Sequence, residues 1–280
     1  MIQPTYEFER PVVAHPTMVY RDSISGLYGV KKRKNGRILT KAKYTAISLY
    51  MNHRGYGMAK IDGPWAIVDE RGKAKTPFEF DEVQAGADED FSIFIVKKDS
   101  VYFLLNEKGK RIGSKVYDEM WQDNYNFLRV RNGLNWGIMK MNGQFLLPVV
   151  YEQISSISPQ YFIVNANGKA GLRNDKNEEI IPMEYHQIQG VKVGWKAVRN
   201  NLIDLYTVDG VKGSITDLTG LYPYGNTFHD AFMMGKKHGK YGLINRDLQW
   251  MIPPIHDTLI RYLEYHRAEK DGKWGMYNNA

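Results

Sequence analysis

The chain has 280 residues, of which 43% are hydrophobic and 25% charged, a composition typical of a soluble globular protein with one large domain or two ordinary ones. It has no cysteine, which excludes disulfides and thiolate chemistry, and its net charge of +7 favours acidic partners but is equally that of an ordinary surface. We identify no secretory signal and no run of 18 apolar residues, so we expect a cytoplasmic protein that does not span a membrane.

The predicted elements follow one another in a repeat. Each copy begins with an alternating apolar run and a turn. A short strand follows in which an aromatic residue directly precedes a glycine, which we call the aromatic–glycine step. A second turn then leads to an apolar run that ends near Pro-x-x-Tyr. The step or its substitute recurs at intervals of 33 to 37 residues, a period typical of repeat architectures. We therefore expect one domain, 1–280, with eight repeats centred on Tyr28, Trp65, Tyr102, Trp136, Ala170, Asp204, Tyr241 and Trp274.

Turn residues flank the steps along the chain. Asn-Gly and Asp-Gly pairs such as Asn132-Gly133, Asn142-Gly143 and Asp271-Gly272 tolerate the positive φ angles of two-residue hairpins. They leave six to eight residues for each strand, so we expect an all-β fold. The best helical candidates are residues 258–269 and a turn near 118–123, and residues 205–235 depart furthest from the repeat.

The middle of the chain shows the repeat most clearly, because residues 130–154 align with residues 164–188 without a gap. Both copies contain Pro-x-x-Tyr near their ends, at Tyr151 and Tyr185. Proline removes one ladder hydrogen bond, which suits an edge or the start of a strand. We expect the aromatic residue that follows to pack between neighbouring repeats.

These segments carry a family resemblance. GLNWGIMKMNGQFLLPVVYEQI, GKAGLRNDKNEEIIPMEYHQI, GKYGLINRDLQWMIPPIHDTL and DGKWGMYNN resemble the bacterial WG-repeat (KWG-repeat) family. The resemblance implies tandem β repeats, with a β-propeller as the proposed architecture. It implies no settled activity, so it transfers no catalytic residue.

Two arrangements of the repeats are open. In a closed β-propeller, residues 2–8 would complete the last repeat, which lacks its Pro-x-x-Tyr half. In an open antiparallel β-solenoid or stack, bare end strands would pair across a homodimer. We favour the propeller.

No pattern points to catalysis. Acidic residues after the Pro-x-x-Tyr aromatic recur in several repeats, which is typical of a scaffold position, and the histidines show no metal-binding spacing. We therefore predict no catalytic residue, no metal and no cofactor.

Two basic clusters are candidates for contact with nucleic acid or an acidic partner. A charged hairpin tip is most often only solvated, but it can also bind phosphate backbones. The candidates are Lys31, Lys32, Arg33, Lys34, Arg37, Lys236, Lys237 and Lys240.

Aromatic residues that the repeat does not require mark two candidate protein-binding segments, one in the irregular tract 220–232 and one near residue 265. Exposed tyrosine and arginine are frequent interface anchors, although aromatics in the tract could equally fill a gap left by the sixth repeat. The candidates are Tyr222, Tyr224, Phe228, Tyr262, Tyr265 and Arg267.

The expected function is therefore binding. We predict a non-catalytic adaptor or accessory subunit with a protein partner. The alternatives are an accessory factor of a nucleic-acid-handling complex and, third, a hydrolase with a central pocket.

Overall fold

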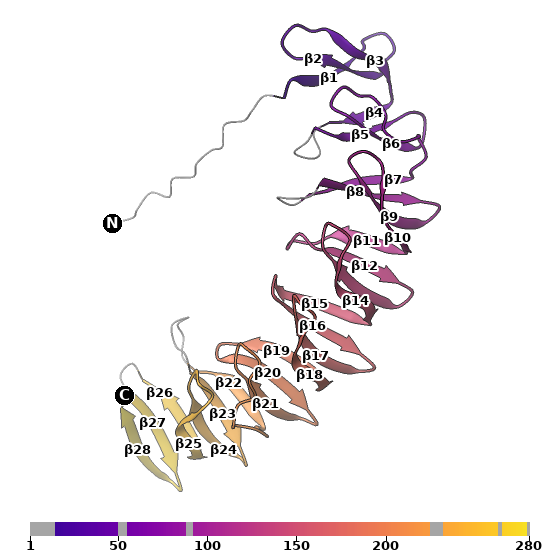
Figure 1. Cartoon of the computed structure of the whole chain (residues 1–280). Helices are drawn as coiled ribbons and strands as arrows, with labels where there is room; N and C mark the ends of the chain where they lie inside the picture. Colours follow the sequence, from indigo (N-terminus) through magenta and orange to yellow (C-terminus); the bar gives the residue numbers. More distant parts are fainter. Residues whose placement is uncertain (1–14, 50–54, 88–91, 225–231, 263–264, 279–280) are drawn as a thin grey trace, which may run out of the picture. The chain divides into compact units, whose positions relative to one another are not determined.

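The computed structural model describes residues 15–49, 55–87, 92–224, 232–262 and 265–278. Every regular element in these ranges is a β-strand, and the strands form eight antiparallel sheets of three or four strands each (Figure 1). The prediction of an all-β chain with about eight repeats is confirmed. Because the described ranges contain no helix, none of their segments is a helix long and apolar enough to cross a membrane.

The chain divides into two compact units, Met1–Asn132 with Met139–Gln144, and Gly133–Ile138 with Phe145–Ala280. The first unit holds three sheets and the first two strands of the fourth sheet. Its strands are β1 (Thr17–Arg21), β2 (Tyr28–Lys32) and β3 (Ile38–Tyr44); β4 (Ala46–Ser48), β5 (Gly57–Lys60) and β6 (Trp65–Val68); β7 (Glu82–Ala87), β8 (Ser92–Lys98), β9 (Val101–Asn106) and β10 (Arg111–Tyr117); β11 (Glu119–Gln122) and β12 (Leu128–Asn132).

The second unit holds the rest of the fourth sheet and the last four sheets. Its strands are β13 (Asn135–Met139) and β14 (Phe145–Tyr151); β15 (Gln153–Ser158), β16 (Tyr161–Ala166), β17 (Lys169–Asn174) and β18 (Glu179–Tyr185); β19 (Gln187–Val191), β20 (Gly194–Arg199) and β21 (Leu202–Tyr206); β22 (Gly220–Pro223), β23 (Met233–Lys237), β24 (Lys240–Ile244) and β25 (Trp250–His256); β26 (Thr258–Arg261), β27 (Tyr265–Lys270) and β28 (Lys273–Asn278).

Each sheet contains one of the eight predicted repeat centres. These centres lie on β2, β6, β9, β13, β17, β21, β24 and β28, which we call the marker strands. The segment that ends at the Pro-x-x-Tyr position forms the next strand of the same sheet after the marker strand. This holds for β3, β10, β14, β18 and β25, which we call the closing strands. In β3 and β10 the proline is replaced by Lys41 and Ser114, and β25 ends in His256. A sheet therefore ends at the Pro-x-x-Tyr aromatic, and the next sheet begins directly after it.

The aromatic residue that ends each closing strand is buried against the following sheet, as the sequence predicts. Tyr44 packs with Ala59 and Val68 of the second sheet, and Tyr185 packs with Trp195 and Tyr206 of the sixth. Burying a large aromatic side chain contributes roughly 1.5–3 kcal/mol, so these residues supply much of the free energy that holds adjacent sheets together.

The predicted hairpin turns are also present. Asn167 and Gly168, with φ angles of 52° and 67°, join β16 to β17, and Asp271 and Gly272, at 51° and 75°, join β27 to β28. Left-handed conformations cost little for glycine and are tolerated by asparagine and aspartate. The turn chemistry therefore fixes where strands end.

Both helical candidates are wrong. Residues 258–269 form β26 and most of β27, and residues 118–123 contain β11. The burial pattern explains the error in the first, because Leu259, His266 and Ala268 are buried while Ile260 is exposed, which is the period of a strand.

The sixth repeat is irregular, as its sequence predicts. Its marker strand β21 is followed by isolated bridges, Tyr206 to Lys212 and Ile203 to Leu218, in place of a regular closing strand. The prediction that residues 2–8 complete the last sheet lies outside the described residues, so closure of the sheets into a ring stays a prediction.

Candidate functional site

The outer face of the last sheet exposes a group of apolar and aromatic side chains. Ile260 pairs with Arg267, which pairs with Met276, so all three side chains share one face of the sheet. Ile260, Trp274 and Met276 are 40%, 44% and 71% exposed. We call this surface the terminal face and define it by Ile260, Tyr262, Tyr265, Arg267, Trp274 and Met276.

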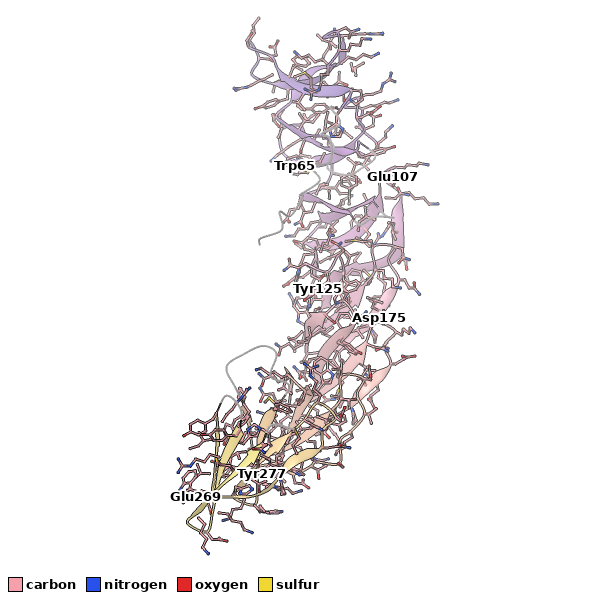
Figure 2. The ribbon with its side chains drawn as sticks, turned by 90° about the vertical axis from the view of Figure 1, so that its left-hand side faces the viewer. Trp65, Glu107, Tyr125, Asp175, Glu269 and Tyr277 are labelled. Atoms are coloured by element: carbon pink, nitrogen blue, oxygen red, sulfur yellow. The ribbon has the colours of Figure 1, made fainter. Side chains whose placement is uncertain are left out.

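Side-chain contacts order the terminal face. The rings of Tyr262 and Tyr265 stack, with centroids 4.9 Å apart and planes 15° from parallel. The guanidinium of Arg267 lies 4.1 Å from the centroid of Trp274. Glu269, paired with Trp274, shares the outer face, and Figure 2 shows it on the same C-terminal sheet as Tyr277. The structure thus brings together three of the predicted protein-binding residues, Tyr262, Tyr265 and Arg267.

The irregular tract contributes less than predicted. Tyr222 lies on β22, is 42% exposed, and its ring centroid is 6.4 Å from that of Tyr241. Phe228 lies outside the described residues. The tract therefore offers one exposed aromatic side chain in the part that the structure describes, and it is separate in sequence from the terminal face.

Tyr224 is a core residue, which corrects its prediction as a partner contact. It is buried with Leu243 and Ile252, and its hydroxyl lies 3.1 Å from His266 Nδ1. Burial raises the pKa of Tyr224 to about 12. The ring fills space between the seventh and eighth sheets, so it is not available to a partner.

The first basic cluster lies on β2 and the turn after it. Lys31 Nζ lies 5.8 Å from the centroid of the Tyr20 ring, and Arg33 Nε donates a hydrogen bond of 3.0 Å to the carbonyl oxygen of His15. Lys34 and Arg37 are exposed. A cavity of about 530 Å³ beside the turn has apolar surface from residues such as Pro16 and Leu39, and its charged lining residues are mostly basic: Lys32, Arg33, Lys34 and Arg71 against Glu70.

The second basic cluster is largely engaged within the fold. Lys237 Nζ donates a hydrogen bond of 2.9 Å to the Thr216 carbonyl, and Lys240 forms an ion pair with Asp257. Lys236 Nζ lies 4.8 Å from the centroid of the Tyr241 ring. The ion pair offsets the charge of Lys240, and the other two contacts hold the side chains of Lys236 and Lys237 against the fold, so the second cluster is less available to an anionic partner.

A buried polar network at the sixth repeat was not predicted. The Tyr185 hydroxyl donates to Asp204 Oδ2 at 2.9 Å and lies 2.6 Å from the Tyr206 hydroxyl, while Lys212 Nζ donates to Asp204 Oδ2 at 2.7 Å. Burial favours the neutral acid, but the hydrogen bonds from Lys212 and Tyr185 outweigh it and hold the pKa of Asp204 below its usual range. Burial and the neighbouring Tyr206 and Asp204 raise the pKa of Tyr185.

This network stabilises the fold and does not form a site for a substrate. Asp204 Oδ1 also accepts a hydrogen bond of 3.4 Å from the Asp217 amide, and the side chain is only 5% exposed, so a substrate has no open approach to the carboxylate. The sequence contains one clue to the network, an aspartate at a repeat position that is aromatic in most other repeats. Across the described ranges, no group of three or more histidine, aspartate or glutamate side chains could hold a metal ion.

Comparisons with known proteins bear on the family and the fold. The family model for the WG-containing repeat matches residues 136–169. No curated protein sequence matches the chain.

Similar solved structures include a eukaryotic initiation factor, with 14% identity over 90% of this chain and 77% of that chain and a TM-score of 0.34. The CNH domain of AfRom2 has 11% identity over 84% and 91% of the two chains and a TM-score of 0.30. Hsv2p of Kluyveromyces lactis has 8% identity over 85% and 97% and a TM-score of 0.28. Structural similarities with identities and TM-scores this low say nothing about function.

The matched segment, residues 136–169, runs from the marker residue Trp136 on β13 to the start of the next marker strand, β17, and so covers one full period of the repeat. The resemblance of this chain to the WG-repeat family is confirmed through that repeat.

Proposed function

We propose that the protein is a non-catalytic adaptor or accessory subunit that binds a protein partner through the terminal face. The observation that carries this proposal is the gathering of Tyr262, Trp274 and Met276 on one exposed sheet face around Arg267. Aromatic residues, methionine and arginine are enriched in protein interfaces, and tyrosine, tryptophan and arginine are the commonest hot spots.

The contacts within the terminal face support the same function. The stack of Tyr262 on Tyr265 and the seating of Arg267 on Trp274 hold four large side chains in place before a partner arrives. Ordering one such side chain on binding costs about 0.5–1.5 kcal/mol, so a surface that is already ordered retains more of its contact energy as affinity.

Affinity capture from the native host tests the proposal. The full chain should recover a stoichiometric protein companion that survives nuclease treatment, and the double variant Ile260→Ser/Tyr262→Ser should lose it. Ile24→Ser is the matched control, because Ile24 is 96% exposed but lies far from this face in the sequence. A companion that the double variant still recovers, or recovery of nucleic acid alone, would overturn the proposal.

A second candidate is an accessory role in a nucleic-acid-handling complex. The observation that favours it is the basic cavity at Lys32, Lys34 and Arg71, beside the exposed turn of the first sheet. Lysine and arginine side chains that contact phosphates release counterions, which drives binding without sequence specificity. Recovery of nucleic acid by the full chain, in the experiment above, would support this role.

A further inference from the structure

Closing strands meet marker strands in the same register in the fifth and seventh sheets. In the seventh sheet Tyr241 pairs with His256 and Leu243 pairs with Ile252, and in the fifth sheet Ala170 pairs with Tyr185 and Leu172 with Ile181. The closing strand thus places an aromatic or histidine side chain opposite the marker residue. In these two sheets it places an aliphatic side chain, four residues earlier, opposite the second residue after the marker.

β28 is a marker strand whose outer edge is open in the described part of the chain. In the last sheet the order of strands is β26-β27-β28, and β28 pairs only with β27 there. A Cβ added to Gly242 of β24 would lie 2.6 Å from the carbonyl oxygen of Ile252, and one added to Gly171 would lie 3.2 Å from that of Ile181. A Cβ added to Gly275 would meet nothing within 4 Å. Within the described ranges, the space that a closing strand fills beside Gly242 and Gly171 is therefore vacant beside Gly275.

A cavity of about 590 Å³ lies at this edge, and its lining includes His256, Lys270, Trp274, Gly275, Met276 and Tyr277. His256 is only 4% exposed, and its Nε2 lies 2.9 Å from the Tyr277 hydroxyl. Its Nδ1 is buried and has no hydrogen-bond partner within the described ranges. Buried polar atoms are nearly always hydrogen-bonded, so this nitrogen is an exception among the described residues, but it has almost no exposed surface and does not itself open to the cavity.

The charge at this edge favours an acidic neighbour. Lys240, one residue before the marker Tyr241, pairs with Asp257, which directly follows the last residue of the closing strand. Lys273 holds the same position before Trp274, and in the described part of the chain it has no carboxylate within ion-pair distance. An incoming strand with an acidic residue after its aromatic would reproduce the missing pair.

We propose that the edge of β28 binds an extended segment of a partner protein as an additional antiparallel strand, with an aliphatic residue opposite Met276, an aromatic residue four positions later opposite Trp274, and an acidic residue next to it. The inference rests on the proposed protein-binding function and names the kind of segment that is bound. An open edge offers unpaired main-chain groups, and strand addition to such edges is a recurring mode of peptide recognition. The chain itself contains this pattern in Leu147, Tyr151 and Glu152.

Fluorescence anisotropy with a labelled peptide tests the inference. The probe is FLLPVVYE, the sequence of residues 145–152, and the control peptide has alanine at the tyrosine position. The full chain should bind the probe at least tenfold more tightly than the control peptide. Gly275→Val should abolish binding without changing the melting temperature, because the new side chain enters the space of the incoming strand and no other atom. Gly242→Val should destabilise the fold, because the backbone of β25 occupies that space.

Three outcomes would overturn the inference. The first is a probe affinity that Gly275→Val leaves unchanged, or no binding of the probe at all. The second is binding that occurs only in the full-length variant Tyr6→Ala/Phe8→Ala, which would show that a segment of the chain itself fills the edge. The third is self-association, measured by sedimentation, that Gly275→Val abolishes, which would assign the edge to a second copy.

The terminal face and the open edge are tested separately. If Ile260→Ser/Tyr262→Ser loses the captured companion while Gly275→Val retains it, the proposed function stands and the strand-binding inference fails. If Gly275→Val alone loses the companion and the probe, the edge is the binding element and the terminal face is not.

Discussion

At the scale of single residues, Asp204 shows how one unusual residue in the repeat replaces apolar packing with a buried hydrogen-bond network. Most other repeats place an aromatic ring at this position, whereas here a carboxylate gathers Tyr185, Lys212 and the Asp217 amide around it. A buried carboxylate is tolerated only when such partners compensate its lost hydration. The irregular segment after β21 supplies both Lys212 and Asp217, so the network and the irregular sixth repeat belong together.

Replacing Lys212 by methionine tests the network. Because the Lys212 side chain is 40% exposed, water screens its bond to Asp204, and we expect the free energy of unfolding at pH 7 to fall by only about 1 kcal/mol. The folded-state pKa of Asp204 lies below 3.8, so the stability it contributes is present above about pH 4 and is lost as the pH falls through that lower pKa.

Urea denaturation at several pH values measures both effects. The difference between the wild type and Lys212→Met should be full at pH 7 and should shrink as the pH falls below about 4 and through the lowered pKa of Asp204. Asp204→Asn should remove this part of the pH dependence. A difference that is equally large at low pH would contradict the role assigned to the Asp204 carboxylate.

At the scale of elements, the closing strand is the part that joins one sheet to the next. β14 alternates between the two environments, since Tyr151 is buried and its neighbour Val150 is 53% exposed. We expect Tyr151→Ala to lower the free energy of unfolding by about 3 kcal/mol, through lost burial and the cavity left behind. Val150→Ala, the adjacent control, should cost less than about 0.5 kcal/mol. Equal losses for the two variants in chemical denaturation would contradict the packing described for the closing strands.

Strands and turns could be predicted from the sequence because their causes are local. Asn-Gly and Asp-Gly pairs fix the hairpins, and the Pro-x-x-Tyr pattern fixes the closing strands. The strand conformation of residues 258–269 could not be predicted. Their apolar and charged residues follow neither the helix period nor the strand period well, and packing against the neighbouring sheet determines which face is buried. The burial of Tyr224 could not be predicted for the same reason, since it depends on contacts with Leu243 and His266, which lie further along the chain.

At the scale of the whole molecule, the period of the repeat predicts eight sheets, while the binding surfaces depend on what the repeat leaves uncovered. Tyr262, Tyr265 and Arg267 could be singled out as residues that the repeat does not require. Trp274 and Met276 could not, because their counterparts in other repeats are scaffold residues; Met276 is exposed in the last sheet, whereas its counterpart Leu243 is fully buried.

The net charge of +7 gives the nucleic-acid alternative a test of its own. If Lys31, Lys32 and Arg33 contact phosphates, the logarithm of the affinity for a random-sequence duplex should fall linearly with the logarithm of salt concentration. Changing all three to alanine should flatten that slope by about three counterions. Changing Lys236, Lys237 and Lys240 should flatten it less, because Lys237 and Lys240 already have partners within the fold. An unchanged slope for the first variant would remove its three residues from any phosphate contact.

Amide hydrogen exchange of the free, full-length protein, resolved by residue, tests the open last sheet most directly. The amides of β24, which is paired on both sides by β23 and β25, should exchange slowly. Those of β28, which has a strand on one side only in the described part of the chain, should exchange much faster, and the probe peptide should slow them. Exchange from β28 that is as slow as that from β24 in the free protein would show that the edge is already filled, and would contradict the surface on which partner binding is proposed.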